Sequence, residues 1–238
     1  MSNFASEMTE TDTILKMQGI VKDFPGVRAL DRVDFDLLRG EIHALVGENG
    51  AGKSTLIKVL TGVYSKDRGE IFIRGKQVNI LSTKASQNLG VACIYQELNL
   101  VPYFNVAQNI YLGIEPLTAL GKIDWTQMYK GANDLLKDLG VELNLHMPVR
   151  KLGMGQRQMV IIARALLRNP AILILDEPTA MLTRGEIKYL FDLLKRLKEQ
   201  GVGILYISHR MEEVFEIADR ITVMRDGMNV STCITKET

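Results

Sequence analysis

The chain has 238 residues, of which 46% are hydrophobic and 24% charged, as in ordinary globular proteins. A formal net charge of +1 does not favour general binding to nucleic acid or to anionic membranes. The two cysteines, Cys93 and Cys233, match no metal or redox spacing, and no apolar stretch approaches the ~18–20 residues of a membrane span. We therefore expect a cytosolic protein with reduced thiols and no nucleic-acid partner, whose link to any membrane is through another protein.

The predicted elements begin after a polar, acidic segment, residues 1–12, which we expect to be a disordered tail. Residues 13–38 alternate apolar and polar side chains, which predicts antiparallel strands. Later apolar runs are continuous, as is typical of parallel strands that helices cover on both faces. These runs lie at residues 42–46, 91–95, 171–175, 202–207 and 221–224.

Helical patterns fill most of the remaining chain. Residues from about 98 to 168 have apolar side chains at helical spacing. A further helix follows the capping box of Thr183 and Glu186 and ends at Gly201. We predict one α/β domain over residues 13–238. It would have a core with a mainly parallel sheet, an N-terminal antiparallel β-subdomain and an inserted α-helical subdomain at about 98–168.

Residues 47–55 fit the pattern G-x-x-x-x-G-K-[ST] of the phosphate-binding loop (P-loop) of nucleoside triphosphatases. Its glycines let several backbone N–H groups point into one hollow, and the helix that follows adds its positive end. Lys53 would reach the β- and γ-phosphates, and the Ser54 hydroxyl would bind Mg²⁺. The predicted phosphate-binding residues are Gly47, Glu48, Asn49, Gly50, Ala51, Gly52, Lys53, Ser54 and Thr55.

Two acids, Asp176 and Glu177, follow the apolar run at 171–175. Open α/β sheets bind ligands at the carboxyl ends of their strands, so these acids are expected at that edge. Asp176 would hold Mg²⁺ through water, and Glu177 would polarise the attacking water as general base, a role worth about 10²–10⁴ in rate. The alternative is an acid pair that faces solvent.

A glycine turn formed by Leu152, Gly153, Met154, Gly155 and Gln156 precedes a helix with a broad apolar face. Five features thus occur along the chain in this order: the phosphate loop, Gln96 after a strand, this turn, the Asp176–Glu177 pair and His209 after a strand. With these five features, residues 14–227 resemble the ATP-binding domain of an ABC transporter. The segments at 24–30, 95–100, 121–125 and 206–211 further resemble the N-terminal half of bacterial monosaccharide importer ATPases of the ribose and galactose type.

The resemblance implies roles for individual residues. Phe24 would stack on adenine, although a buried core phenylalanine is the alternative. Gln96 would touch Mg²⁺ and the attacking water, the alternative being a polar residue at a strand end, and His209 would contact the γ-phosphate. The glycine turn would cap the γ-phosphate bound by another domain. The usual turn is L-S-G-G-Q, so Gly153 and Met154 depart from it, and a site completed by this turn is expected to bind or turn over less well.

The resemblance also implies cofactors and partners. The expected ligands are ATP and Mg²⁺. The expected partners are a second ABC ATPase domain, in the same or a fused chain, membrane permease subunits and, indirectly, an extracytoplasmic sugar-binding protein. The chain would act peripherally on the cytoplasmic side of the inner (plasma) membrane. Relatives usually carry two such domains, so we expect a fragment or a single-domain relative.

Two other functions compete with this interpretation. The first is an ATP-gated regulatory or mechanical ABC protein. One of the chromosome type would insert long coiled coils, for which the 123 residues between Lys53 and Asp176 leave no room, and one of the translation type is expected to show a basic linker and a second domain, which this sequence does not show. A P-loop kinase or GTPase would leave the Gly155–Gln156 turn and His209 without a role. Residues 99–106 carry apolar side chains that either dock a permease helix or anchor the helical insertion.

Overall fold

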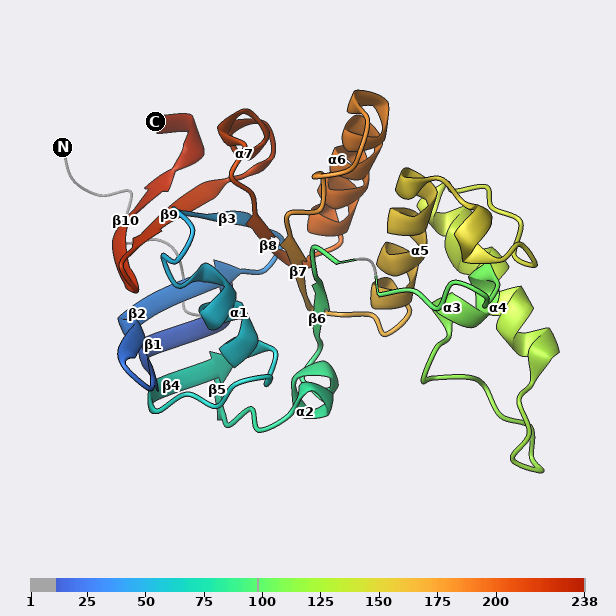
Figure 1. Cartoon of the computed structure of the whole chain (residues 1–238), viewed down its shortest axis with the longest axis horizontal. Coiled ribbons are helices and arrows are strands. Elements are labelled where there is room, and N and C mark those ends of the chain that lie inside the picture. The colour runs from blue at the N-terminus through green and yellow to red at the C-terminus, as the bar shows by residue number, and fades with distance from the viewer. Residues whose placement is uncertain (1–11, 98, 238) are drawn as a thin grey trace. The chain divides into compact units, whose positions relative to one another are not determined.

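The structure, a computed structural model, describes residues 12–97 and 99–237 (Figure 1). The predicted tail at residues 1–12 therefore lies outside the described residues, except for Asp12. By its internal contacts the chain divides into two units. The first holds the residues up to Cys93, Pro170–Glu177 and those from Leu194 onward, and the second holds Ile94–Asn169 and Pro178–Leu193. Each unit is described by itself.

The first unit contains a four-stranded antiparallel sheet. Its strands are β1 (Thr13–Phe24), β2 (Val27–Leu38), β4 (Arg68–Ile73) and β5 (Lys76–Val78), in the order β2-β1-β4-β5 (Figure 1). β1 and β2 are joined by a tight turn in which Gly26 has a φ of 81°. The antiparallel strands predicted at residues 13–38 are confirmed, whereas β4 and β5 were not predicted.

A six-stranded sheet has the order β10-β9-β3-β8-β7-β6. β3 (Ile42–Val46) pairs in parallel with β8 (Gly203–Ile207) and β9 (Arg220–Arg225), and β7 (Ile172–Asp176) pairs in parallel with β8. Every residue of β3 and β8 is buried, which explains the continuous apolar runs. The predicted mainly parallel sheet of the α/β core is confirmed.

The end of one strand and the presence of another differ from the prediction. β6 (Val91–Ile94) ends before Tyr95. Residues after Gly227, where no strand was predicted, form β10 (Met228–Ile234), which pairs antiparallel with β9 and is followed by the 3₁₀ turn η3 (Thr235–Glu237). β10 was missed because it has no apolar run: as an edge strand it leaves its side chains exposed or half-buried.

The helices of the first unit are α1 (Lys53–Leu60), α2 (Thr83–Asn88) and α7 (Met211–Ile217). α6 (Arg184–Glu199) begins at the predicted capping box, in which the Thr183 N–H donates to Oε2 of Glu186 over 2.8 Å and the Glu186 N–H donates to Oγ1 of Thr183 over 3.4 Å. Gly201, with a φ of 86°, follows the end of α6 as predicted.

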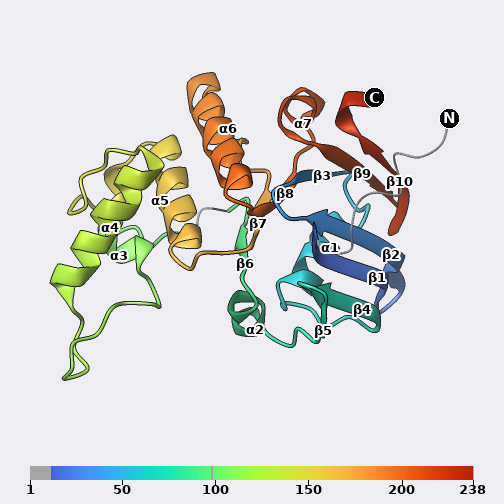
Figure 2. The same ribbon diagram turned by 180° about the vertical axis from the view of Figure 1, so that it is seen from behind.

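The second unit contains α3 (Val106–Ile110), α4 (Trp125–Leu139), the 3₁₀ turn η2 (Val149–Lys151) and α5 (Met154–Leu166). α3, α4 and α5 pack against one another (Figure 2). Asn109 is buried on α3, and its amide accepts from the Val101 N–H and donates to three backbone carbonyls of residues 101–105. We keep the helical-subdomain limits of about 98–168 as a proposal. In the part of the chain that the structure describes, no helix is long and apolar enough to span a bilayer.

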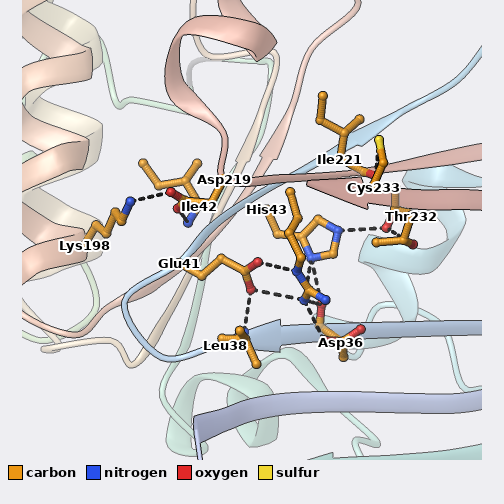
Figure 3. Close-up of polar contacts among 12 residues, drawn as sticks. Asp36, Leu38, Glu41, Ile42, His43, Lys198, Asp219, Ile221, Thr232 and Cys233 are labelled. Carbon is orange, nitrogen blue, oxygen red and sulfur yellow. Dashed lines mark hydrogen bonds and ion pairs between the residues drawn. The ribbon is translucent and has the colours of Figure 1, made fainter. Parts of the chain in front are cut away.

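A partly buried polar cluster in the first unit joins β2, β3 and β9 (Figure 3). Nε of Arg220 donates to Oε1 of Glu41 over 2.5 Å, and its NH2 group donates to Oδ2 of Asp36 over 2.5 Å. His43 is fully buried beside them, with Nε2 2.7 Å from Oγ1 of Thr222. Burial, with a smaller contribution from Arg220, lowers the pKa of His43 to about 4, so this imidazole is neutral at pH 7.

Candidate functional site

The loop between β3 and α1 takes a backbone course that requires glycine. Gly47, Gly50 and Gly52 have φ values of 153°, 88° and 103°. A Cβ at Gly47 would lie 2.3 Å from the Met224 carbonyl oxygen, and one at Gly52 would lie 2.8 Å from the Ala29 carbonyl oxygen. β9 and β2 therefore approach the loop so closely that a side chain at either glycine would collide with backbone.

Lys53 is the first residue of α1 and folds back over the loop. Its Nζ donates to the carbonyl oxygens of Gly47, over 2.6 Å, and Glu48, over 3.0 Å. Burial lowers the pKa of Lys53, and the charges of Glu177 and Asp176 oppose that shift. The ammonium group thus lies within electrostatic reach of both strand-end acids.

The start of α1 offers groups suited to an anion. Its N-cap residue, Gly52, has no side chain to bond the first N–H groups of the helix. Ser54 is exposed in the first turn and Thr55 is half-buried, while Glu48 and Asn49 are exposed on the loop. A helix N-terminus preceded by such a loop favours negative charge.

The two acids occupy the carboxyl end of β7. Burial raises the pKa of Asp176, as does the charge of Glu177, whereas Lys53 opposes the shift. Glu177 has a φ of 50°, uncommon outside glycine, and its N–H donates to the Ile207 carbonyl over 2.9 Å. This turn of the backbone places Oε1 of Glu177 3.0 Å from Nδ1 of His209. The first unit thus brings Lys53, Asp176, Glu177 and His209 together, and their catalytic roles stay predictions.

Phe24 lies at the end of β1, half-buried and outside the fully buried core. Its ring meets the ring of Tyr64 edge to face at a centroid distance of 5.2 Å, and Nζ of Lys22 lies 5.4 Å from its centroid. Sequence reasoning did not single out Tyr64, and no pattern around this residue marks it. An accessible aromatic ring beside a cation is compatible with a stacking role, which stays a prediction for Phe24.

The remaining predicted site residues belong to the second unit. Gln96 is exposed two residues beyond β6. The glycine turn was expected to precede a helix, but α5 begins inside it at Met154, so three of its five residues form the first helical turn. Leu152 and Gly155 are buried, and the Gly153 N–H donates to Oε1 of Gln156 over 3.1 Å. Gln156 thus satisfies the N–H of the residue that caps α5.

The donors expected to hold Mg²⁺ are the oxygens of Ser54, Asp176 and Gln96. Among the described residues no group of three or more His, Cys, Asp or Glu side chains forms a metal cage. Mg²⁺ is usually held by one or two protein oxygens together with water and substrate phosphates. The first unit offers this kind of donor set, an exposed hydroxyl on α1 and a carboxylate at the end of β7.

The chain was compared with known proteins. Residues 30–180 match the family described as "ABC transporter". The chain is 50% identical over 220 residues to the ribose import ATP-binding protein of Caldanaerobacter subterraneus subsp. tengcongensis, covering 92% of this chain and 44% of the relative. It is 52% identical over 224 residues to the xylose import ATP-binding protein of Thermoanaerobacter pseudethanolicus, covering 93% and 44%. The chain thus spans less than half the length of these relatives.

The fold has counterparts among solved structures. A structure described as a dimeric bacterial ABC transporter cassette matches with a TM-score of 0.80 and 25% sequence identity. The match covers 93% of this chain and 98% of that one. Nearly the whole described chain therefore has the architecture of that cassette.

Proposed function

Since the chain belongs to the ABC transporter family, we propose that it binds ATP with Mg²⁺ at residues 47–55, hydrolyses it, and so energises sugar import through a membrane permease. One observation carries this proposal: Lys53, Asp176, Glu177 and His209 gather beside a glycine loop at the carboxyl ends of β3, β7 and β8. That edge is where open α/β sheets bind ligands. The names of the ribose and xylose relatives support the transport of a sugar.

In the proposed site Lys53 is the main contact for the phosphates. Its ammonium now donates to two loop carbonyl oxygens, which the oxygens of a triphosphate would replace as acceptors. At ~4 Å and an effective dielectric of about 20, an ammonium and a phosphate charge attract by about 4 kcal/mol before desolvation. A helix terminus typically contributes about 0.3–1 kcal/mol, so Lys53 dominates over the N-terminus of α1.

Glu177 is proposed as the general base and His209 as the residue that orients it and meets the γ-phosphate. The 3.0 Å contact between Nδ1 of His209 and Oε1 of Glu177 supports this pairing. Ser54, Asp176 and Gln96 would hold Mg²⁺, which when bound neutralises charge on the phosphates. Phe24 would stack on the adenine ring.

The proposal extends to partners, because hydrolysis in this family is proposed to need a second cassette. The dimeric cassette of similar fold supports such a pair. The turn at residues 152–156 would then meet the γ-phosphate bound by the partner's loop, and the missing serine hydroxyl would weaken that partner site. Membrane permease subunits, an extracytoplasmic sugar-binding protein and a position at the cytoplasmic face of the membrane complete the proposal.

The test compares ATP binding and turnover in matched variants. Glu177→Gln should keep ATP affinity measured by calorimetry while lowering hydrolysis at least about 10²-fold, because the base is lost. Glu216→Gln removes another carboxylate, exposed on α7, and should leave both quantities unchanged. If Glu177→Gln hydrolyses ATP like the unmodified chain, or if the unmodified chain binds no ATP, the proposal is wrong.

A further inference from the structure

Glu186, on the first turn of α6, contacts two segments of the second unit with one carboxylate. Its Oε2 accepts from the Thr183 N–H and from the Thr183 hydroxyl, each over 2.8 Å. Its Oε1 lies where a side chain at Gly155 would have to be, since a Cβ there would sit 1.8 Å from Oε1 and 2.3 Å from Cδ. The carboxylate therefore rests directly on the backbone of the turn at residues 152–156.

This contact explains why residue 155 is a glycine, without any appeal to backbone flexibility. Its backbone has no positive φ, so conformation alone does not require glycine. The requirement comes from Glu186, whose carboxylate occupies the space of the missing Cβ. Hydrogen bonds from the backbone and hydroxyl of Thr183, and more weakly from the Gly155 N–H, lower the pKa of Glu186 and keep it ionised.

We propose that Glu186 is a positioning residue, which ties the turn at 152–156 to the loop at 178–183 that follows the Asp176–Glu177 pair. The inference rests on the proposed function, in which the turn meets a γ-phosphate held by a partner cassette. In that assembly the turn and the loop move as one body, because one carboxylate binds both. The turn lacks the serine hydroxyl, so its donors besides the Gln156 amide are backbone N–H groups of the first turn of α5, which this contact would hold in place.

The surroundings offer no substitute for the Glu186 contact. A cavity of about 220 Å³ lies beside it, lined among others by Glu142, Gln156 and Tyr189. Gln156 is already engaged with the Gly153 N–H. Removing the Glu186 side chain would enlarge the cavity and leave the Gly155 backbone without this contact.

The experiment uses the full chain carrying Glu177→Gln, so that bound ATP is not consumed, with Glu186→Ala, Glu186→Gln or Glu142→Ala added. Two quantities are measured: hydrogen exchange of the amides at residues 153–157, and ATP-driven association by sedimentation. Glu186→Ala should speed exchange and weaken association, each by about tenfold, the size of losing one capping contact. Glu186→Gln should give values between those of the reference and Glu186→Ala, because its single amide oxygen can still accept from Thr183 whereas the amide NH2 group in the place of Oε1 cannot accept from the Gly155 N–H. Glu142→Ala, which changes an exposed carboxylate at the same cavity, should change neither.

The outcomes separate this inference from the proposed function. ATP binding to the unassociated chain, measured by calorimetry at a protein concentration too low for association, should be the same in all variants, because the phosphate loop lies in the other unit. Loss of ATP binding in the reference chain contradicts the proposed function itself. If ATP binds and Glu186→Ala matches the reference in exchange or association, the inference is overturned. It is also overturned if Glu186→Gln recovers neither quantity relative to Glu186→Ala, if Glu186→Ala associates more tightly, or if ATP drives no association of the reference chain.

Discussion

Replacement of His43 by glutamine tests the electrostatics of the partly buried polar cluster. The imidazole is fully buried and lies beside Arg220, so its pKa falls from 6.5 to about 4. At about 1.36 kcal/mol per pH unit this corresponds to about 3 kcal/mol. Between pH 6.5 and 4 the folded chain binds fewer protons than the unfolded chain. Stability from the neutral imidazole is therefore present above pH 6.5 and is lost as the pH falls toward 4.

Urea unfolding across pH 7 to 4 measures this effect as the free energy of unfolding. Glutamine does not titrate and can still bond the hydroxyl of Thr222, so the His43→Gln curve should fall less steeply by up to about 3 kcal/mol over that range. His146→Gln, at an exposed position of the other unit, is the control and should keep the slope of the unmodified chain. Parallel curves for His43→Gln and the unmodified chain would refute the reasoning.

Three further predictions concern the phosphate loop, the aromatic pair and the ion cluster. Gly47→Ala places a Cβ 2.3 Å from the Met224 carbonyl oxygen, so we expect calorimetry to show loss of ATP binding; retained affinity would contradict the loop geometry. Phe24→Ala should weaken ATP binding by about 1–3 kcal/mol, the usual size of a base–aromatic stack, and an unchanged affinity would remove Phe24 from the site. Arg220→Met leaves the buried Glu41 carboxylate without its ion pair, so urea unfolding should show a loss of about 3 kcal/mol or more. A loss below about 1 kcal/mol would show that the cluster is solvated.

The strands that are easiest to predict are those whose side chains are all buried. β3 and β8 are buried at every position and give continuous apolar runs, so they stand out in the sequence. β5 and β10 are mostly exposed or half-buried, and their polar side chains resemble loops. Their strand structure comes from pairing with β4 and β9, which a local pattern does not record.

The candidate site could be predicted where its residues are contiguous in the sequence, whereas the polar cluster outside the site could not be predicted. The residues of the phosphate loop are contiguous in the sequence, so one short motif includes the groups of the loop that would bind phosphate. The cluster of Asp36, Glu41, His43 and Arg220 joins residues up to 184 positions apart, and no spacing rule marks it. A helix was predicted only after the glycine turn because glycine disfavours helix interiors, yet Met154, Gly155 and Gln156 form the first turn of α5.

Two glycines of the phosphate-loop motif are required by backbone groups that lie far from them in the sequence. Gly50 has a positive φ but open space around its missing side chain, so only conformation constrains it. Gly47 and Gly52 are constrained twice, by conformation and by the carbonyls of Met224 and Ala29. An alanine should therefore cost less at Gly50 than at either neighbour. Glycine is therefore required in the motif because β2 and β9 lie close to a loop whose N–H groups must stay open to an anion.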